Sequence, residues 1–484
     1  MAGRLSKYFR NKSGIILIFV LFLSILSLIF IYFDDFDDVT YETFPQIHSS
    51  DRIIIFSPHP DDESLANSGL IKEALKANAT VMVVMMTNGD ATPINISDYT
   101  IKNNISNFTG NIGDYRHIET INALKNLGLN ESNIIFLSYP DGALKYLFGS
   151  NWDYNNPYKG ADNSSNPYDH STYNFSFEKN APYCGANVEK NLQQIIKDFK
   201  PNMVFYPDDG DEHPDHAATS AFVIYALIKS NYTGGAFTYL VHKGSWPSPL
   251  NYQPKSDLEA PRDVLNLDGT WYMLNLTDED ENSKEKAISS HDTQISLMEN
   301  YLKSFVRVDE IFANYPVIDV EKVTSTNFTN GLPSSSSFED LRYDSQTTLL
   351  LPSTDLAGAG LVYDDNYAYL LLKTSGDINS MIIYDYHLRI YNGTEFKRLD
   401  VSVGNGTADY ELKASNSINA GGNIAADIQK NIMVVKVPIK LFKNAKLIMM
   451  STDIKDANKN KLDDMSWRVF KFPTDFLSTM EELL

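Results

Sequence analysis

The chain has 484 residues and a formal net charge of -21 at pH 7. So acidic a chain argues against nucleic acid or an anionic membrane surface as a partner, because both require a basic patch. Its single cysteine, Cys184, excludes an intramolecular disulfide and a metal site built from several thiolates. Because single hydrophobic cores rarely grow beyond about 250–300 residues, the length predicts more than one domain.

The N-terminal end has the pattern of a membrane anchor. Basic residues mark segment 1–14, an uninterrupted apolar run fills 15–33, and a polar stretch that begins with acidic residues follows at 34–50. The apolar run is about as long as a bilayer core is thick, and longer than the apolar part of a typical signal peptide. We therefore expect a retained transmembrane helix at 15–33 and a stalk at 34–50. Since positive charge marks the cytoplasmic side, the chain is predicted to be a single-pass cell membrane protein whose body lies outside.

The first strand and helix enclose a polar turn. A short β-branched run at 53–56 is followed directly by polar residues and then by a helical pattern at 64–76. This order predicts a buried parallel strand that leads into a helix. The turn between them carries His59, Asp61 and Asp62, and in open α/β sheets ligands bind at this carboxyl end of a strand.

Strands and helices continue to alternate up to residue 320. Further buried strands are expected at 80–87, 134–137, 203–206 and 236–241, and helices at 113–127, 186–199, 217–229 and 284–305. The alternation predicts a Rossmann-like, mostly parallel α/β sheet for a domain at 51–320. Residues 143–185 are rich in Asn, Tyr, Ser, Pro and Asp and are expected to form a long loop. Its tyrosines either stack on sugar rings or fill space beneath the loop.

The C-terminal third has a different pattern. Residues 321–337 are rich in Ser, Thr and Asn, which is typical of a linker. From 338 to 484, short runs with a period of two are separated by Gly, Asn and Asp. This period predicts an all-β sandwich, accessory to the domain before it.

Two of the polar turns carry side chains that bind metals. His59 and Asp62 follow the first strand, and His213, Asp215 and His216 follow the strand at 203–206. One imidazole with carboxylates is half of a zinc site, because a catalytic zinc takes three protein ligands and readily accepts nitrogen and oxygen donors. Both turns have the same order of strand, polar turn and helix, so we expect them to meet at one edge of the sheet.

The motif HPDDE at 59–63, together with HPDH at 213–216, resembles the PIG-L/LmbE-like family of zinc-dependent N-deacetylases. These enzymes remove acetyl groups from N-acetylglucosaminyl and related amino-sugar compounds. The resemblance extends to RHIE at 116–119 and YPDG at 139–142, and it covers about residues 51–245. It implies a Rossmann-like catalytic domain and says nothing about the C-terminal third.

The resemblance also implies a role for particular side chains. The Zn²⁺ ligands would be His59, Asp62 and His216, and Asp61 would be the general base. His213 would protonate the leaving group or stabilise the oxyanion, with Asp215 as the carboxylate that orients it. Some members carry a tyrosine where this chain has Asp211, so the loop tyrosines or His213 would have to replace it.

Arg116 and Asp141 match family positions that contact the substrate. The residues themselves leave an alternative open, because an arginine at the head of a helix often forms an ion pair and an Asp-Gly turn needs no ligand. His242 follows the strand at 236–241 and either reaches the same edge of the sheet or stays outside the site. Nothing in the sequence around His291 gives it a role.

These expectations combine into one function and two alternatives. The main hypothesis is a membrane-anchored, extracytoplasmic, zinc-dependent hydrolase of linear amide bonds. It would remove the acetyl group of N-acetylglucosaminyl or related amino-sugar groups in a surface glycan or glycolipid. One alternative is a metal-dependent esterase or amidase acting on other acylated sugars. The other is a non-catalytic glycan-binding surface protein, which leaves the complete set of reactive residues unexplained.

Overall fold

The computed structural model describes residues 40–473, apart from 104, 106, 107, 161–167, 209, 266, 341–350, 405, 406, 415, 416 and 421–423. The elements below all belong to one compact unit, Glu42–Leu484. The strand expected at 347–350 lies outside the described residues.

The expected membrane anchor is not supported by the described residues. The segment 15–33 lies outside the described residues, and within the part of the chain that is described no helix is both long and apolar enough to cross a bilayer. The α/β and β-rich parts of the predicted fold class stand, but its transmembrane helix does not. A single-pass membrane protein with an extracytoplasmic body is therefore not supported.

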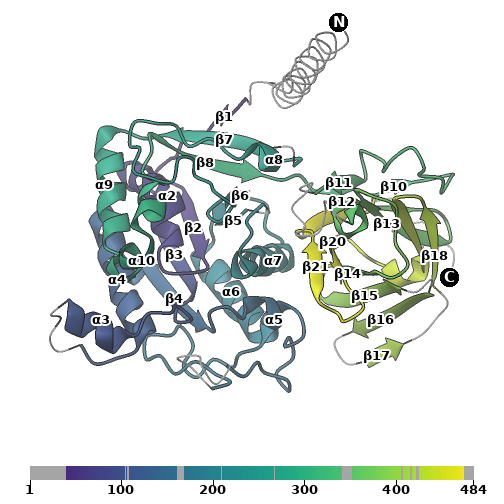
Figure 1. Ribbon diagram of the computed structural model, residues 1–484, viewed down its shortest axis with the longest axis horizontal. Helices are drawn as coiled ribbons and strands as arrows, with labels where there is room; N and C mark the ends of the chain where they lie inside the picture. Colours follow the sequence, from purple (N-terminus) through teal and green to yellow (C-terminus); the bar gives the residue numbers. More distant parts are fainter. Residues whose placement is uncertain are drawn as a thin grey trace, which may run out of the picture. The chain divides into compact units, whose positions relative to one another are not determined.

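The first part of the chain forms a mixed sheet with the strand order β1-β7-β8-β6-β5-β2-β3-β4 (Figure 1). Its strands are β1 (Glu42–Thr43), β2 (Arg52–Ser57), β3 (Thr80–Thr87), β4 (Ile134–Tyr139), β5 (Met203–Pro207), β6 (Gly235–Tyr239), β7 (Thr270–Asn275) and β8 (Asp309–Asn314). Neighbouring strands from β6 to β4 are parallel, whereas β8 is antiparallel to β6 and β7. The central strands are buried on both faces, which explains their continuous apolar runs.

Helices cover both faces of this sheet. They are α2 (Asp62–Lys76), α3 (Ile96–Lys102), α4 (Ile112–Leu127), α5 (Leu144–Phe148), α6 (Gly185–Phe199), α7 (Pro214–Lys229), α8 (Arg262–Leu265), α9 (Asp278–Ser289) and α10 (Asp292–Lys303), with a 3-10 turn at Glu131–Asn133. The helices α2, α4, α9 and α10 pack together on one side, and α5, α6 and α7 on the other (Figure 1). The single helix expected at 284–305 is divided, because His291 leaves the helical conformation between α9 and α10.

A buried ion pair holds α9 against the sheet. The Nζ atom of Lys284 lies 2.8 Å from Oε1 of Glu310 in β8, and both side chains are fully buried. Glu310 also accepts hydrogen bonds from the amides of Gly69 and Leu70 in α2. One carboxylate thus joins a strand to two helices, and Lys284 is the cation that balances it.

We expect Lys284→Met to lower the free energy of unfolding by about 3–5 kcal/mol, because it leaves the Glu310 carboxylate buried without a cation. Denaturant titration followed by circular dichroism measures the change. Lys190→Met is the matched control, since this lysine pairs with Glu178 on the surface, with 56% of its side chain exposed. The control should change stability by less than about 1 kcal/mol. Equal losses in the two variants would contradict the assignment.

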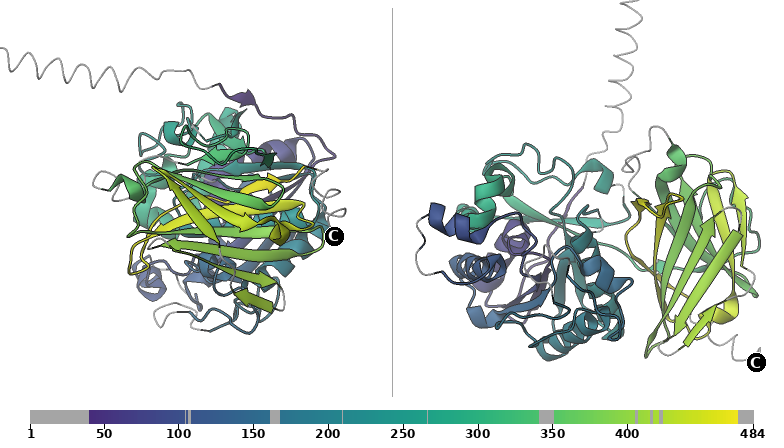
Figure 2. Two further views of the ribbon diagram at one scale, coloured as in Figure 1. Left: turned by 90° about the vertical axis from the view of Figure 1, so that its right-hand side faces the viewer. Right: turned by 60° about the horizontal axis from the view of Figure 1, so that its bottom comes forward.

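The residues after β8 form two further sheets (Figure 2). The first contains β10 (Glu321–Lys322), β11 (Ser337–Glu339), β12 (Leu356–Tyr363), β13 (Tyr367–Thr374), β18 (Ala425–Gln429) and β19 (Ile432–Pro438). The second contains β9 (Ile318–Asp319), β14 (Ile383–Tyr391), β15 (Phe396–Gly404), β16 (Thr407–Ala414), β17 (Ser417–Ala420), β20 (Leu447–Lys455), β21 (Lys461–Asp464) and β22 (Arg468–Lys471). Short 3-10 turns lie at Pro352–Thr354 and Ile439–Phe442.

The two sheets share one hydrophobic core and so form a sandwich. Leu370 and Val435 of the first sheet belong to the same buried cluster as Tyr386 and Ile448 of the second. The segment expected as a linker, 321–337, begins with β10 and reaches the start of β11, and both strands pair with β12. These residues therefore contribute strands to the sandwich.

Candidate metal centre

Two strand ends meet at the middle of the α/β sheet. Strands β2 and β5 are parallel neighbours, with β3 and β4 beyond β2 and β6 beyond β5. The winding direction reverses between them, and ligands of open α/β sheets bind at such a point, outside the carboxyl ends of the strands. The loop after β2 supplies His59 and Asp62, and the loop after β5 supplies His213 and His216. The topology thus brings together two motifs that are far apart in the sequence.

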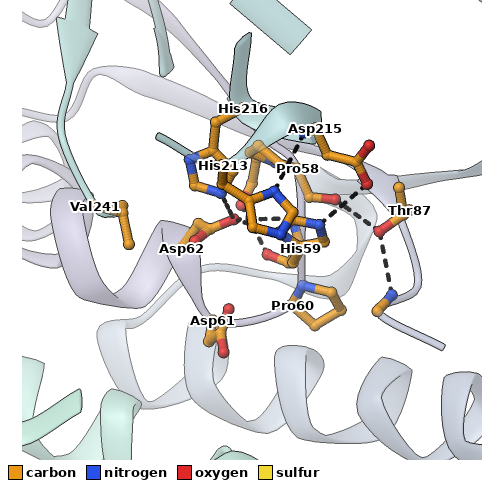
Figure 3. Close-up of polar contacts among 12 residues, drawn as sticks. Pro58, His59, Pro60, Asp61, Asp62, Thr87, His213, Asp215, His216 and Val241 are labelled. Atoms are coloured by element: carbon orange, nitrogen blue, oxygen red, sulfur yellow. Dashed lines mark hydrogen bonds and ion pairs between the residues drawn. The ribbon is translucent and has the colours of Figure 1, made fainter. Parts of the chain in front are cut away.

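Asp62 lies between two imidazoles (Figure 3). Its Oδ2 atom is 3.3 Å from Nδ1 of His59 and 3.1 Å from Nε2 of His216. All three residues are buried. The Oδ1 atom of Asp62 and the Nε2 atom of His216 have no hydrogen-bond partner, although each is buried. Unpaired buried polar atoms are costly, and a cation among these donors would satisfy them.

Carboxylates hold each imidazole from its other side. The Nε2 atom of His59 is 3.2 Å from Asp141 Oδ1 and 3.4 Å from Asp215 Oδ2, and Nδ1 of His216 is 2.9 Å from Asp211 Oδ2. These contacts fix the rings so that the remaining nitrogens face the same point. A carboxylate behind a ligating histidine is typical of metal sites. The residues therefore fit a metal ion that prefers nitrogen and oxygen donors, such as zinc.

The charges of the site also favour a cation. Burial lowers the pKa of His216, but Asp211 and Asp62 outweigh it and raise this pKa to about 9. Burial also lowers the pKa of His59, but the neighbouring carboxylates outweigh this effect and raise the pKa well above its ordinary value. At Asp62 burial raises the pKa, but the two histidines hold it well below the usual range. The carboxylates thus draw protons onto both rings, and a metal bound to neutral imidazoles would supply that positive charge in their place.

Asp61 has a strained backbone at the start of α2. Its φ of 144° and ψ of -32° lie where residues other than glycine are rarely found. Its amide donates to Glu63 Oε2 at 3.0 Å, and its Oδ2 accepts a hydrogen bond from Arg116 at 3.3 Å. Burial raises the pKa of Asp61 to about 7, against the opposing effect of Arg116. A carboxylate with a pKa near 7 suits a general base at neutral pH.

His213 caps α7. Its Nδ1 accepts a hydrogen bond from the amide of Asp215 at 3.2 Å, so the ring proton lies on Nε2. A nitrogen of His213 lies within 4.8 Å of nitrogens of His59 and His216. Burial lowers the pKa of His213 to about 4, and the positive charge of these two histidines acts in the same direction. His213 is therefore a neutral hydrogen-bond donor beside the metal ligands.

Asp215 does not orient His213 through its carboxylate. That carboxylate touches His59 and accepts hydrogen bonds from the amides of Gly142 and Leu144, at 2.6 Å and 3.1 Å. It therefore fixes the loop after β4 against the histidine that follows β2. Only the backbone amide of Asp215 contacts His213.

Arg116 and Asp141 both face into the site. Arg116 is 4% exposed and donates to the carbonyls of Pro60 and Gly89, at 2.5 Å and 2.8 Å, besides its contact with Asp61. Asp141 contacts His59 and accepts a hydrogen bond from the amide of Ala91. Burial raises the pKa of Asp141, but the bond to His59 outweighs it and lowers this pKa to about 2. Both residues hold the turns of the site, and contact of either with a substrate stays a prediction.

The tyrosines of the long loop differ in burial, and stacking of the exposed ones on sugar rings stays a prediction. Tyr173 is buried and donates to Asp90 Oδ2 at 2.6 Å, so it fills space beneath the loop. The ring of Tyr158 stacks on Tyr146, with centroids 5.6 Å apart. Tyr154 and Tyr168 are each 54% exposed and present open faces to solvent.

The motifs missed several residues of the site. Asp211 holds His216, and His242 lies beside it, with ring centroids 4.7 Å apart. The only signal for His242 was its place after a strand. His291 is fully buried, and its Nε2 lies 3.3 Å from Oε1 of Glu63, the residue that holds the Asp61 backbone. No local pattern indicated this contact, because His291 comes from a helix start far along the chain.

Part of the chain matches a known protein family. Residues 54–227 match the family PIG-L, described as GlcNAc-PI de-N-acetylase. No curated protein matches the chain. Among solved structures, the chain is similar to the conserved protein TT1542 from Thermus thermophilus, with 18% identity over 55% of this chain and 96% of that chain and a TM-score of 0.32.

Two solved deacetylases are similar to the same extent. The zinc inhibited form of teicoplanin deacetylase Orf2 has 18% identity over 54% of this chain and 97% of that chain, with a TM-score of 0.36. N,N'-diacetylchitobiose deacetylase from Pyrococcus horikoshii has 20% identity over 54% of this chain and 82% of that chain, with a TM-score of 0.32. Similarities of this size do not bear on activity or substrate.

Proposed function

Since residues 54–227 belong to the PIG-L family, we propose that this chain is a zinc-dependent N-deacetylase. Its substrates would be N-acetylglucosaminyl or related amino-sugar groups, and the reaction would be hydrolysis of the acetamide. The observation that carries the proposal is the meeting of His59 Nδ1 and His216 Nε2 on the carboxylate of Asp62, at 3.3 Å and 3.1 Å. Asp61, the neighbouring residue, adds to the same turn a carboxylate that can act as the general base.

Each side chain has a task in amide hydrolysis. His59, Asp62 and His216 would hold the ion, which when bound acts as a Lewis acid toward the carbonyl and the attacking water. Asp61 accepts a proton as the water oxygen bonds to the acetyl carbon, and it returns this proton to the nitrogen as the carbon–nitrogen bond breaks. Acetate and a free amine are then the products.

His213 fits the stabilisation of the oxyanion better than the donation of a proton. Its pKa is lowered to about 4 by burial and by the neighbouring positive rings, so it is neutral at pH 7. A neutral imidazole whose Nε2 carries the proton donates a hydrogen bond where negative charge develops on the carbonyl oxygen. A metal cation that took the place of the protons on these rings would keep positive charge beside His213 and so preserve its neutral form.

The burial of the site residues indicates how a substrate enters. Asp62 and His216 are buried, whereas Asp61, His213 and His242 are half-buried. The acyl group would therefore approach past the base and these two imidazoles. The reactive carbonyl would then lie between Asp61 and His213, as the proposed roles require.

Acetate release by the full-length protein tests the proposal. The substrates would be a panel of N-acetylglucosaminyl compounds and the same compounds with O-acetyl groups in place of the acetamide. We expect acetate from the N-acetyl set, its loss on treatment with a chelator, and its recovery when zinc is added back.

The other outcomes separate the alternatives. Acetate from the O-acetyl set alone would assign the protein to the esterases of acylated sugars. If protein that carries zinc released no acetate from either set, deacetylation of this substrate class would be contradicted. Activity that a chelator does not reduce would contradict the role of the metal.

A further inference from the structure

A third strand end contributes to the metal centre. Strand β6 lies next to β5, and His242 follows it at the same edge of the sheet. The ring centroid of His242 is 4.7 Å from that of His216 and 5.2 Å from that of His213. Its Nε2 atom lies 4.0 Å from Oδ1 of Asp62. His242 therefore faces the oxygen of Asp62 that the other two histidines do not use.

The three donors form a set that fits one ion. Ligand atoms of Asp62, His216 and His242 all lie within 4.8 Å of one another. Two atoms in this region, Oδ1 of Asp62 and Nε2 of His216, are buried without hydrogen-bond partners. An ion among the three would satisfy both atoms at once.

Tyr301 in α10 sets the tautomer of His242. Its hydroxyl lies 2.8 Å from the carbonyl oxygen of Val241 and 3.2 Å from Nδ1 of His242. The hydroxyl has one proton, which it donates to the closer carbonyl, so its oxygen accepts a hydrogen bond from Nδ1 of the ring. The ring proton is then on Nδ1, and the lone pair of Nε2 faces the carboxylate of Asp62. This is the form in which histidine binds a metal.

Asp211 couples the position of His242 to that of His216. One oxygen, Oδ2, contacts Nδ1 of His216 at 2.9 Å and accepts hydrogen bonds from the amides of Val241 and His242, at 3.1 Å and 3.0 Å. The same carboxylate thus orients one metal ligand and fixes the backbone that carries the other imidazole. Residues that orient ligands in this way are part of the metal site.

We propose that Nε2 of His242 is a further protein ligand of this metal centre. The inference rests on the proposed function in one respect, since the ion is the one that His59, Asp62 and His216 would hold. The donor set then has three imidazoles and one carboxylate. Four protein ligands close a tetrahedral zinc site, so substrate binding must either displace His242 or expand the coordination to five. With 34% of its side chain exposed, His242 is the ligand on the open side of the site.

Metal affinity and cobalt spectroscopy test this assignment without reference to turnover. The variants are His242→Ala, His242→Gln and Tyr301→Phe, with His170→Ala as the control, because His170 lies in the long loop beside Asp169. Zinc dissociation constants are measured by competition with a chromophoric chelator. Each protein is also loaded with Co²⁺, whose visible absorption weakens as the coordination number rises.

We expect both His242 variants to raise the zinc dissociation constant by at least about tenfold and to change the Co²⁺ spectrum. Tyr301→Phe should also weaken zinc binding, but less strongly. The imidazole of His242 remains in this variant, while the hydroxyl that sets its tautomer is lost. His170→Ala should match the wild type. Wild-type affinity and an unchanged spectrum in folded His242→Gln would overturn the inference, and circular dichroism verifies that each variant is folded.

One further variant separates this inference from the proposed function. If His216→Ala loses zinc while the His242 variants keep it, His242 is not a ligand and the proposed function is unaffected. If His216→Ala also binds zinc like the wild type, the ligand set itself is wrong and the proposed function fails with it.

Discussion

Asp61→Ala should reduce the rate constant of acetate release by about 10²–10⁴-fold, the usual contribution of a general base, while the protein keeps its zinc. The side chain of Asp61 does not join the donors around Asp62. Its carboxylate contacts Arg116 at 3.3 Å, and burial raises its pKa to about 7. Removing it takes away the group that accepts the proton of water and leaves the proposed ligands His59 and His216 in place.

Kinetics and metal analysis on the same preparation check this result. Asp278→Ala is the matched control, because Asp278 is likewise an aspartate at the start of a helix, with 86% of its side chain exposed. It should keep both activity and zinc. Loss of zinc from Asp61→Ala would mean that a ligand had been mistaken for the base, and retention of full activity would remove Asp61 from the mechanism.

His216→Ala should lose zinc and activity together. The ring is fully buried, its Nε2 has no hydrogen-bond partner, and its Nδ1 is held by Asp211. His213 does not replace it, because its Nδ1 accepts the hydrogen bond from the amide of Asp215. In this variant the carboxylates of Asp62 and Asp211 would lose the imidazole that lies between them.

Thermal unfolding with and without zinc measures this loss. An ion that binds only the folded protein stabilises it by about 2.7 kcal/mol at a concentration 100 times its dissociation constant. The wild type should therefore unfold at a higher temperature when zinc is added, and His216→Ala should show no shift. His170→Ala should respond like the wild type. A zinc-dependent shift that persists in His216→Ala would contradict the ligand set.

Short-range patterns in the sequence predicted the two turns that the structure brings together. Buried strands such as 53–56 and 203–206 appear as continuous apolar runs, because both of their faces are covered. The polar residues that follow such runs lie at the carboxyl edge of the sheet, which marked both turns as candidates, and the resemblance to the PIG-L/LmbE-like family then implied His59, Asp62 and His216 as the ligands. These signals depend only on neighbouring residues, so they can be recognised before the fold is known.

Patterns that depend on distant partners were harder to interpret. The segment 284–305 was expected to form one helix, but His291 divides it where its ring turns toward Glu63. The segment 321–337 has the composition of a linker, yet β10 and β11 pair with β12, because edge strands gain their hydrogen bonds from a partner rather than from their own composition. The membrane helix expected at 15–33, from its apolar run and flanking charges, lies outside the described residues, and no described helix is long and apolar enough to cross a bilayer.

The sequence by itself determined which residue types stand at the ends of strands β2 and β5, and therefore the chemistry available there. Only the tertiary structure decided which nitrogen of each ring faces Asp62, and that the Asp215 carboxylate holds His59 instead of His213. It also brought His242 and Tyr301 to the same centre. The reason is physical: local order along a chain follows from backbone and side-chain periodicity. The orientation of an imidazole, in contrast, is set by the hydrogen-bond partner on its far side, and for His59 and His242 that partner comes from a distant part of the chain.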